Sequence, residues 1–149
     1  MNRLQNKVAV ITGGARGIGK ATAKKFMGEG ATVAIWDINE NLGKATAAEL
    51  EKEGTGQVRF YKVNTSSLAA VSAAAAQVME DFGSIDILIN NAGITRDASL
   101  KKMTGEQWQQ VIDVNLTGVF NCTKAIYPYM VEREDGRIIN AASVVAHNG

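Results

Sequence analysis

The stretch Thr12-Gly13-Gly14-Ala15-Arg16-Gly17-Ile18-Gly19 decides how the chain folds. It follows the apolar run Val8–Ile11, which predicts a strand, and it leads into residues 20–26, which predict a helix. Glycines let the backbone turn sharply and let a ligand approach the main chain, because they carry no Cβ. The first amides of a helix lack partners within the helix, and the helix dipole favours negative charge there. A strand, a glycine-rich turn and a helix in this order predict a site for the pyrophosphate of a dinucleotide.

We expect the dinucleotide to contact this turn at Gly13, Arg16, Gly17, Ile18 and Gly19. The alternative is a plain strand-to-helix turn with no ligand. One glycine normally suffices for such a turn, whereas three are spaced along this one between suitable flanks. The spacing therefore favours the binding site.

Apolar runs alternate with helix-length segments along the whole chain, which is typical of βαβ units and a parallel sheet. We predict one α/β domain, a Rossmann-like doubly wound parallel sheet of about five strands in the order 3-2-1-4-5. The predicted strands are 8–12, 32–36, 58–63, 85–89 and 137–141, and the predicted helices are 17–29, 39–53, 66–82 and 105–131. Gly30 is expected to stop the first helix, Asn39 to cap the second, and Ser66 or Ser67 to cap the third.

The long fourth helix carries more apolar surface than one contact with a sheet requires. Two adjacent stripes run along it, one of Trp108, Ile112, Val119, Ile126 and Met130 and one of Val111, Val114, Cys122 and Ala125. The stripes either merge into one broad buried face or receive a helix from another subunit. We expect a homo-oligomer.

Composition narrows the class of protein. The 149 residues carry a formal net charge of +1 and show no basic stripe, so we expect no nucleic-acid partner. The single cysteine, Cys122, excludes an internal disulfide and fits a reducing compartment. No stretch approaches the ~20 apolar residues of a membrane span, and the first residues show no signal-peptide core. We therefore expect a cytoplasmic protein without a membrane partner.

Three further features narrow the class again. Asn90-Asn91-Ala92-Gly93 ends the fourth strand, Asn115 lies in the long helix, and Ser143 follows the fifth strand. Together with the opening turn, these residues resemble the short-chain dehydrogenase/reductase superfamily in order, spacing and position, from Lys7 to the end of the chain. Residues 90–97 are most similar to the 3-oxoacyl carrier-protein reductases and the acetoacetyl-CoA reductases.

Asp37 ends the second strand, where a carboxylate can accept hydrogen bonds from both hydroxyls of an adenosine ribose. It would repel a 2′-phosphate, which favours NAD over NADP as the cofactor. Arg16 favours NADP, because family members that use NADP often carry a basic residue just before the second glycine of the turn. Two structural alternatives stay open: Asp37 as a cap for the next helix, and Arg16 as a solvated side chain.

The resemblance implies further cofactor contacts. Asn64 stands where the family usually has an aspartate that contacts adenine, and its amide still offers a donor and an acceptor. Asn91, Ala92 and Gly93 are expected beside the cofactor, with Gly93 allowing close passage. A bracing role within the sheet is an equal alternative for the asparagines. His147 has no acidic or cysteine neighbours in the sequence and is expected to lie in a surface loop.

The resemblance also implies the catalytic groups. In the family, hydride passes between the nicotinamide and a carbonyl or alcohol carbon, while a serine binds the substrate oxygen and a tyrosine transfers its proton. A lysine four residues after that tyrosine lowers the pKa of the tyrosine, and an asparagine holds a water next to the lysine. Ser143 and Asn115 match the serine and the asparagine. None of the three tyrosines is followed by a lysine four positions later.

We therefore interpret the chain as the N-terminal, cofactor-binding part of a longer reductase of 3-oxoacyl thioesters or similar ketones, inactive by itself. Two alternatives stay open. The chain is a stand-alone α/β module that binds a nucleotide without turnover, or it is half of a split or self-associating protein. No metal is expected. Acidic neighbours around Arg133 would repel an acidic carrier protein, which favours a CoA thioester or a small ketone as the substrate.

Overall fold

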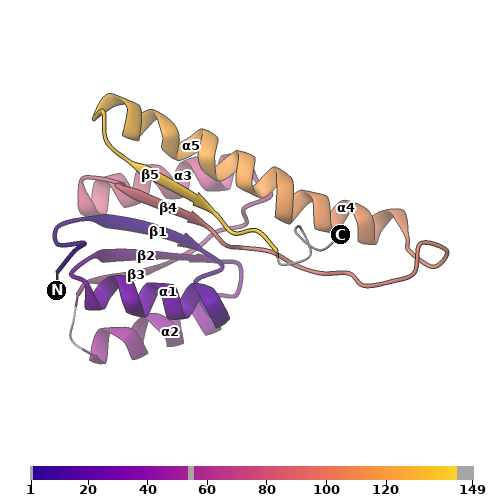
Figure 1. Cartoon of the computed structure of the whole chain (residues 1–149), viewed down its shortest axis with the longest axis horizontal. Coiled ribbons are helices and arrows are strands. Elements are labelled where there is room, and N and C mark those ends of the chain that lie inside the picture. The colour runs from indigo at the N-terminus through magenta and orange to yellow at the C-terminus, as the bar shows by residue number, and fades with distance from the viewer. Residues whose placement is uncertain (1, 54–55, 144–149) are drawn as a thin grey trace.

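The structure is a computed structural model that describes residues 2–53 and 56–143. Strands and helices alternate from the first strand to the last (Figure 1). The elements are β1 (Val8–Thr12), α1 (Gly17–Gly28), β2 (Thr32–Asp37), α2 (Glu40–Lys52), β3 (Val58–Lys62), α3 (Leu68–Phe82), β4 (Ile87–Asn90), α4 (Gly105–Ile112), the π-helical turn η1 (Asp113–Thr117), α5 (Gly118–Glu132) and β5 (Arg137–Asn140).

The five strands form one parallel sheet in the order β3-β2-β1-β4-β5, which confirms the predicted topology. The first strand lies in the middle, and the chain moves outward from it in one direction and then in the other. In such a sheet the segments that follow β1 and β4 leave towards opposite faces at the switch in strand order, and ligands bind in the crevice between them.

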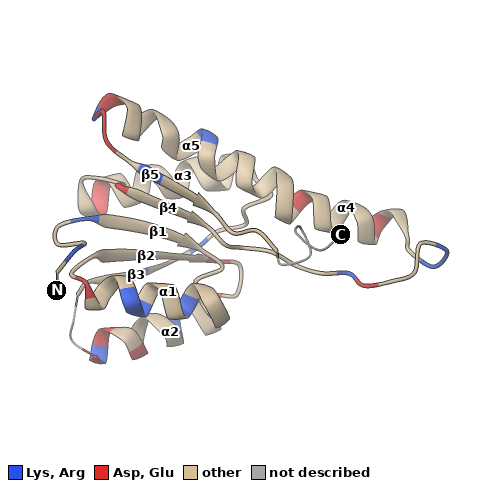
Figure 2. Ribbon diagram, viewed as in Figure 1, with Lys and Arg blue, Asp and Glu red and all other residues tan. Residues whose placement is uncertain are grey.

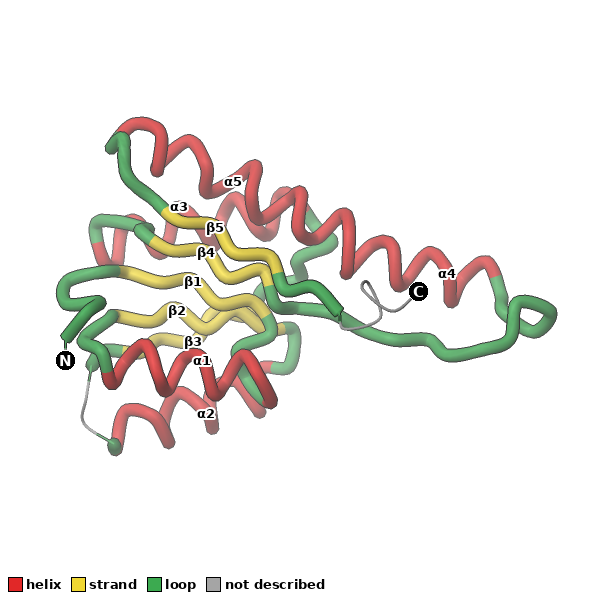
Figure 3. The backbone as a smooth tube through the Cα atoms, viewed as in Figure 1, coloured by secondary structure: helices red, strands yellow, loops and turns green. Residues whose placement is uncertain are grey.

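Helices cover both faces of the sheet. In Figure 3, α1 and α2 lie on one face, and α3 and α5 lie on the other. Alternate residues of β1 serve the two layers: Val10 packs in the cluster with α3 and α5, whereas Ile11 packs in the cluster with α1 and α2. All five residues of β1 are buried, as expected for a central parallel strand covered on both sides.

The predicted start and stop signals hold. Asn39 accepts a hydrogen bond from the Leu42 amide at 3.1 Å, and Ser67 accepts one from the Ala70 amide at 3.2 Å. Gly30 follows α1 with φ +90°. The fourth strand begins at Ile87 rather than Ile85. Asp86 is also bonded to β1, since its amide donates to the Val8 carbonyl at 2.9 Å and its carboxylate accepts from the Val8 amide at 2.8 Å. His147 lies outside the described residues.

The long fourth helix is continuous but not uniform, which corrects the prediction of one regular helix over residues 105–131. Its middle is the π-helical turn η1, in which the Gly118 amide donates to the Asp113 carbonyl five residues earlier. Such turns are rare and are frequent at functional sites. This one contains Asn115.

The two predicted apolar stripes do not merge into one broad buried face, so that alternative is wrong. In α5, Cys122, Ile126 and Met130 are buried, but no residue of α4 is, and Trp108 is 60% exposed. In Figure 1, α4 and the loop before it extend beyond the sheet as an arm. Burial raises the pKa of the Cys122 thiol to about 12, so this cysteine is an inert core residue.

A second apolar surface, which we term the α5 outer face, faces away from the sheet. It consists of exposed side chains spaced four or seven residues apart: Leu116, Phe120, Tyr127 and Val131. Neither of the two apolar stripes predicted along this helix includes these residues. Large apolar side chains gathered on one helix face are typical of an interaction surface.

Asp86 joins three elements at the amino-terminal edge of the sheet. Its side chain is 3% exposed. It accepts hydrogen bonds from the Val8 amide at 2.8 Å and the Ser84 hydroxyl at 3.1 Å, and it pairs with Arg133 of the α5 C-cap at 3.0 Å. Lys7 lies 3.6 Å from the same carboxylate. The buried carboxylate, with its two exposed cationic partners, fixes the end of α5 against the starts of β1 and β4.

Charged residues on α1 and α2 form pairs of opposite sign rather than a field of one sign. Figure 2 shows acidic and basic residues interspersed along α1 and α2. Lys20 pairs with Glu49 at 2.6 Å and Lys24 pairs with Glu53 at 3.0 Å. Within the described part of the chain, no helix combines the length and apolar character that crossing a bilayer requires.

Candidate functional site

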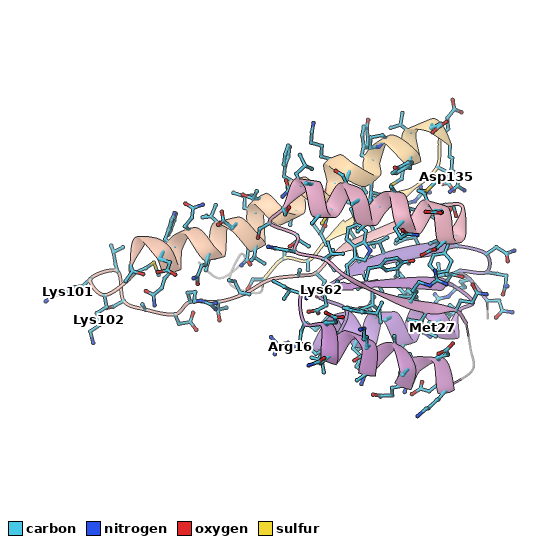
Figure 4. All side chains as sticks on the ribbon, turned by 180° about the vertical axis from the view of Figure 1, so that it is seen from behind. Arg16, Met27, Lys62, Lys101, Lys102 and Asp135 are labelled. Atoms are coloured by element: carbon cyan, nitrogen blue, oxygen red, sulfur yellow. The ribbon has the colours of Figure 1, made fainter. Side chains whose placement is uncertain are left out.

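A cleft of about 610 Å³ opens at the carboxyl ends of β1, β2 and β4. Its walls come from the glycine turn, the end of β2, residues 63–66, residues 91–96 and the junction of α4 with η1. Figure 4 labels Arg16 and Lys62 at this end of the sheet, and Asp135 at the opposite end. The cleft therefore occupies the crevice that the strand order predicts.

The three motif glycines serve different purposes. Gly13 has φ +64°, and a Cβ on it would lie 3.0 Å from the Ala92 Cα, so β1 and β4 can converge only because it is glycine. Gly17 has φ +55° and lines the cleft, with open space where its Cβ would be. Gly19 does not line the cleft. A Cβ there would overlap the carbonyl oxygen of Gly13, so Gly19 lets α1 pack against the turn.

The first backbone amides of α1 have no capping side chain to donate to. Arg16 occupies the N-cap position in an extended conformation, makes no capping hydrogen bond, and is followed by no acidic residue in the first turn. The other helices that begin after a loop, α2, α3 and α4, are capped by Asn39, Ser67 and Thr104. An uncapped helix start at a cleft wall suits an anion such as a pyrophosphate. Ile18, 79% exposed, and Arg16 both line the same wall.

Asp37 ends β2 and lines the cleft beside this turn. One carboxylate oxygen accepts from the Ala15 amide at 3.2 Å and the other from the Asn39 amide at 3.0 Å. These bonds hold the carboxylate between the glycine turn and α2, where Asn39 is the residue that caps α2. Asp37 itself is not the cap, which corrects that alternative.

Trp36 precedes Asp37 and was not anticipated from the sequence. Its side chain is fully buried on the opposite face of β2, yet it lines the cleft floor. Within the described residues, its indole N–H has no hydrogen-bond partner. A buried aromatic residue directly before the strand-ending aspartate is the signal that could have identified it.

Asn64 lines the cleft after β3, next to Thr65 and Ser66. Its Oδ1 accepts a hydrogen bond from the Ser66 amide at 3.0 Å, and its carbonyl oxygen accepts from the Ser67 amide at 3.1 Å. The side chain thus shapes the turn that leads into α3. A contact with adenine stays a prediction.

Asn91 and Ala92 are joined to β1 through Thr12. The Thr12 hydroxyl accepts from the Asn91 amide at 3.0 Å and the Ala92 amide at 2.9 Å, and it donates to the Ile89 carbonyl at 3.3 Å. The Asn91 Nδ2 donates to the Thr12 carbonyl at 3.1 Å. Asn91 therefore braces the ends of β1 and β4 against each other, which is the alternative role given for the asparagines above. Asn91, Ala92 and Gly93 all line the cleft as well.

Asn90 faces away from the cleft into a small polar cluster between the sheet and α5. Its Nδ2 donates to the Asn140 Oδ1 at 2.9 Å and to the Thr123 hydroxyl at 3.3 Å. This cluster links the ends of β4 and β5 to α5.

The two candidate catalytic residues lie outside the cleft lining. Asn115 forms a reciprocal pair with the Ile94 backbone: its Oδ1 accepts from the amide at 2.9 Å and its Nδ2 donates to the carbonyl at 3.0 Å. Its side chain therefore holds η1 against the segment after β4. Ser143 is exposed and is the last described residue after β5. Among the described residues, no group of acidic, histidine and cysteine side chains is arranged to hold a metal.

Comparison with known proteins assigns this arrangement to a family. The model of the short chain dehydrogenase family matches residues 7–149, so the chain belongs to that family. The chain is 47% identical to the 3-oxoacyl-(acyl-carrier-protein) reductase FabG of Thermotoga maritima, covering 99% of this chain and 59% of that protein. It is 46% identical to the acetoacetyl-CoA reductase of Paracoccus denitrificans, covering 93% of this chain and 55% of that protein.

Solved structures agree with this assignment. NAD⁺-bound xylitol dehydrogenase matches 99% of the chain with a TM-score of 0.94 at 32% identity, over 56% of its own length. A short-chain dehydrogenase structure from Novosphingobium aromaticivorans matches with a TM-score of 0.92 at 33% identity. The chain thus spans somewhat less than 60% of the length of the relatives it matches.

Proposed function

We propose that the chain is the cofactor-binding part of an NAD(P)-dependent oxidoreductase that reduces a 3-oxoacyl thioester or a similar ketone. The observation that carries the proposal is the uncapped start of α1, which opens onto a cleft beside two glycines with positive φ. Backbone donors, a helix dipole and open space at Gly17 suit a pyrophosphate. Asp37 is placed to accept hydrogen bonds from a ribose.

When bound, the dinucleotide would supply hydride chemistry. The residues of this chain would bind and orient it: the turn at Gly13–Gly19 would hold the pyrophosphate, Asp37 the ribose, and residues 63–66 the base. Ser143 would contact the substrate oxygen by resemblance. We infer that the 149 residues do not turn over by themselves, since they contain no tyrosine followed four positions later by lysine.

Calorimetric titration tests the proposal directly. We expect NADH to release or absorb heat with a single saturable site, and we expect no NADH oxidation with acetoacetyl-CoA. Absence of binding to NADH and to NADPH would refute the binding site and favour the split-protein alternative. Turnover by the pure chain would refute the proposal that it is inactive by itself. Binding without turnover would agree both with the cofactor-binding part of a longer reductase and with a stand-alone module.

The cofactor proposed is NAD, with NADP as the alternative. Replacing the carboxylate in Asp37→Ser is expected to shift the ratio of NADPH to NADH affinity by about tenfold towards NADPH, because repulsion of a 2′-phosphate is removed. Titration of both cofactors measures this ratio. Glu40→Gln is the matched control: it removes a negative charge three residues away that does not line the cleft. An equal shift in both variants would contradict a specific role for Asp37.

The substrate proposed is a CoA thioester or small ketone rather than a carrier-protein thioester. Near the end of α5, Arg133 pairs with Asp86, which leaves Glu132 and Glu134 to dominate the adjacent surface. Two acidic side chains there would disfavour an acidic carrier protein. The names of the relatives include both substrate classes.

A second copy of the chain is the proposed partner for the α5 outer face. Phe120 is 59% exposed and Tyr127 57% exposed, and both line a shallow apolar groove together with Val119 and Thr123. A helix face of this kind is self-complementary across a twofold axis. The cytoplasm, inferred from the single buried cysteine, stays the proposed location.

Phe120→Glu is expected to weaken self-association at least tenfold, because a charge would be buried in the apolar contact. Sedimentation equilibrium at several concentrations measures the dissociation constant. Leu100→Glu, a substitution at a 92% exposed apolar residue on the arm, is the control and should associate like the unsubstituted chain. A monomer at all concentrations before substitution would contradict the proposed homo-oligomer.

A further inference from the structure

Residues 63–66 form the wall of the cleft next to α3. The start of this segment is fixed by Val63, whose side chain packs in the core and whose amide donates to the Asp37 carbonyl at 3.0 Å. Beyond Val63, the bonds within the turn, from the Ser66 and Ser67 amides to Asn64, set its shape only. The position of residues 64–66 therefore depends on a contact from another element.

Asn121 of α5 makes that contact. Its Nδ2 donates to the Thr65 carbonyl at 2.9 Å, and both residues are buried, with 4% and 9% of their surface exposed. Across residues 2–53 and 56–143, no other side chain from outside the segment hydrogen-bonds to the backbone of residues 64–66. Loss of this donor would leave a buried carbonyl without a partner.

Close packing supports the hydrogen bond one turn earlier on the helix. Gly118 is buried, and a Cβ on it would lie 2.9 Å from the Thr65 Oγ1 and 3.2 Å from the Thr65 Cβ. The helix backbone and Thr65 are thus in direct contact. A residue with any side chain at position 118 would push the segment away from the helix.

The opposite wall is held by the same stretch of helix. In η1, Asn115 binds the amide and the carbonyl of Ile94, which lines the cleft. Asn115 and Asn121 lie six positions apart and contact opposite walls, so η1 and the first turn of α5 set the separation of these walls.

We propose that Asn121 is a positioning residue for the adenosine half of the dinucleotide, acting through Thr65 on the wall formed by residues 63–66. This inference rests on the proposed function. Asn121 does not line the cleft, and its effect on binding passes entirely through the backbone that it holds.

The test compares Asn121→Leu with the unsubstituted chain, using ADP-ribose as the ligand because it keeps the adenosine and the pyrophosphate and lacks the nicotinamide. We expect calorimetry to show ADP-ribose binding about tenfold weaker in the variant, the effect of one lost buried hydrogen bond. Without ligand, the amides of Ser66 and Ser67 are expected to exchange with deuterium about tenfold faster. If the leucine variant does not fold, Asn121→Ser serves in its place, because the shorter serine side chain cannot reach the Thr65 carbonyl and adds no apolar bulk.

Ile126→Val is the matched control, because it loosens a fully buried position of the same helix without touching residues 64–66. It should leave ADP-ribose affinity and the exchange of both amides unchanged. The inference about Asn121 would be overturned if Ile126→Val and Asn121→Leu weakened ADP-ribose binding equally, or if Asn121→Leu left both affinity and exchange unchanged. Neither outcome would affect the proposed function. If the unsubstituted chain bound no ADP-ribose, the proposed function would fail and this inference with it.

Discussion

Gly17→Ala is expected to weaken NADH binding about a hundredfold. Gly17 has φ +55° and lines the cleft, with no atom within 4 Å of the position of a Cβ. A methyl group there would occupy the space proposed for the pyrophosphate and would break one or two charge-assisted hydrogen bonds, each worth about 1.5–3 kcal/mol. The same methyl would cost the free protein about 1 kcal/mol of stability, because alanine disfavours positive φ. Calorimetric titration measures the affinity, and thermal unfolding measures the stability.

Gly28→Ala is the control for this experiment. Gly28 ends the same helix far from the cleft, and it also has open space around its Cβ position. Alanine there should stabilise α1 by up to about 1 kcal/mol and leave NADH affinity unchanged. Equal NADH affinity in Gly17→Ala and the unsubstituted chain would show that the glycine turn does not receive the pyrophosphate.

Asp86→Ala is expected to lower the free energy of unfolding by about 1–3 kcal/mol, because it leaves the buried Val8 amide without an acceptor, whereas the Arg133 side chain is 39% exposed and can be solvated. Total stabilities of single domains are about 5–15 kcal/mol, so this one side chain accounts for a large share. Urea denaturation monitored by circular dichroism measures the change. The free energy of unfolding of Asp86→Asn should lie between those of Asp86→Ala and the unsubstituted chain, since the asparagine amide oxygen can still accept from the Val8 amide.

Asp135→Ala provides the comparison for Asp86. Its carboxylate also pairs with Lys7, at 3.0 Å, and that pair raises the pKa of Lys7 and lowers the pKa of Asp135. However, Asp135 is 47% exposed, and exposed pairs contribute about 1 kcal/mol or less. If Asp86→Ala and Asp135→Ala destabilised the protein equally, burial would not be the source of the Asp86 effect.

Sequence reasoning predicted the features that depend on neighbouring residues. The parallel α/β class follows from the alternation of short apolar runs with helices, and the caps Asn39 and Ser67 follow from their positions before helical periods. The glycine turn is also local, because strand, turn and helix are contiguous between Val8 and Gly28.

Contacts between distant residues could not be predicted in the same way. The role of Asn115 beside a catalytic water stays a prediction, whereas its hydrogen bonds to Ile94, which lies 21 residues earlier, are visible only in the folded chain. Asn121 resembles an ordinary polar residue on a helix until the fold places Thr65 against it. The π-helical turn also has no local signal, because the residues of η1 suit a regular helix equally well.

The two tryptophans lie in opposite surroundings, which gives the protein built-in optical reporters. Trp36 is enclosed beneath the cleft, whereas Trp108 is 60% exposed on the arm. Emission from the enclosed indole should change when the cleft is filled, and emission from the exposed one should respond to what contacts the arm. With Trp108→Phe and Trp36→Phe measured separately, one fluorimeter could follow the interior and the periphery of the molecule as independent signals.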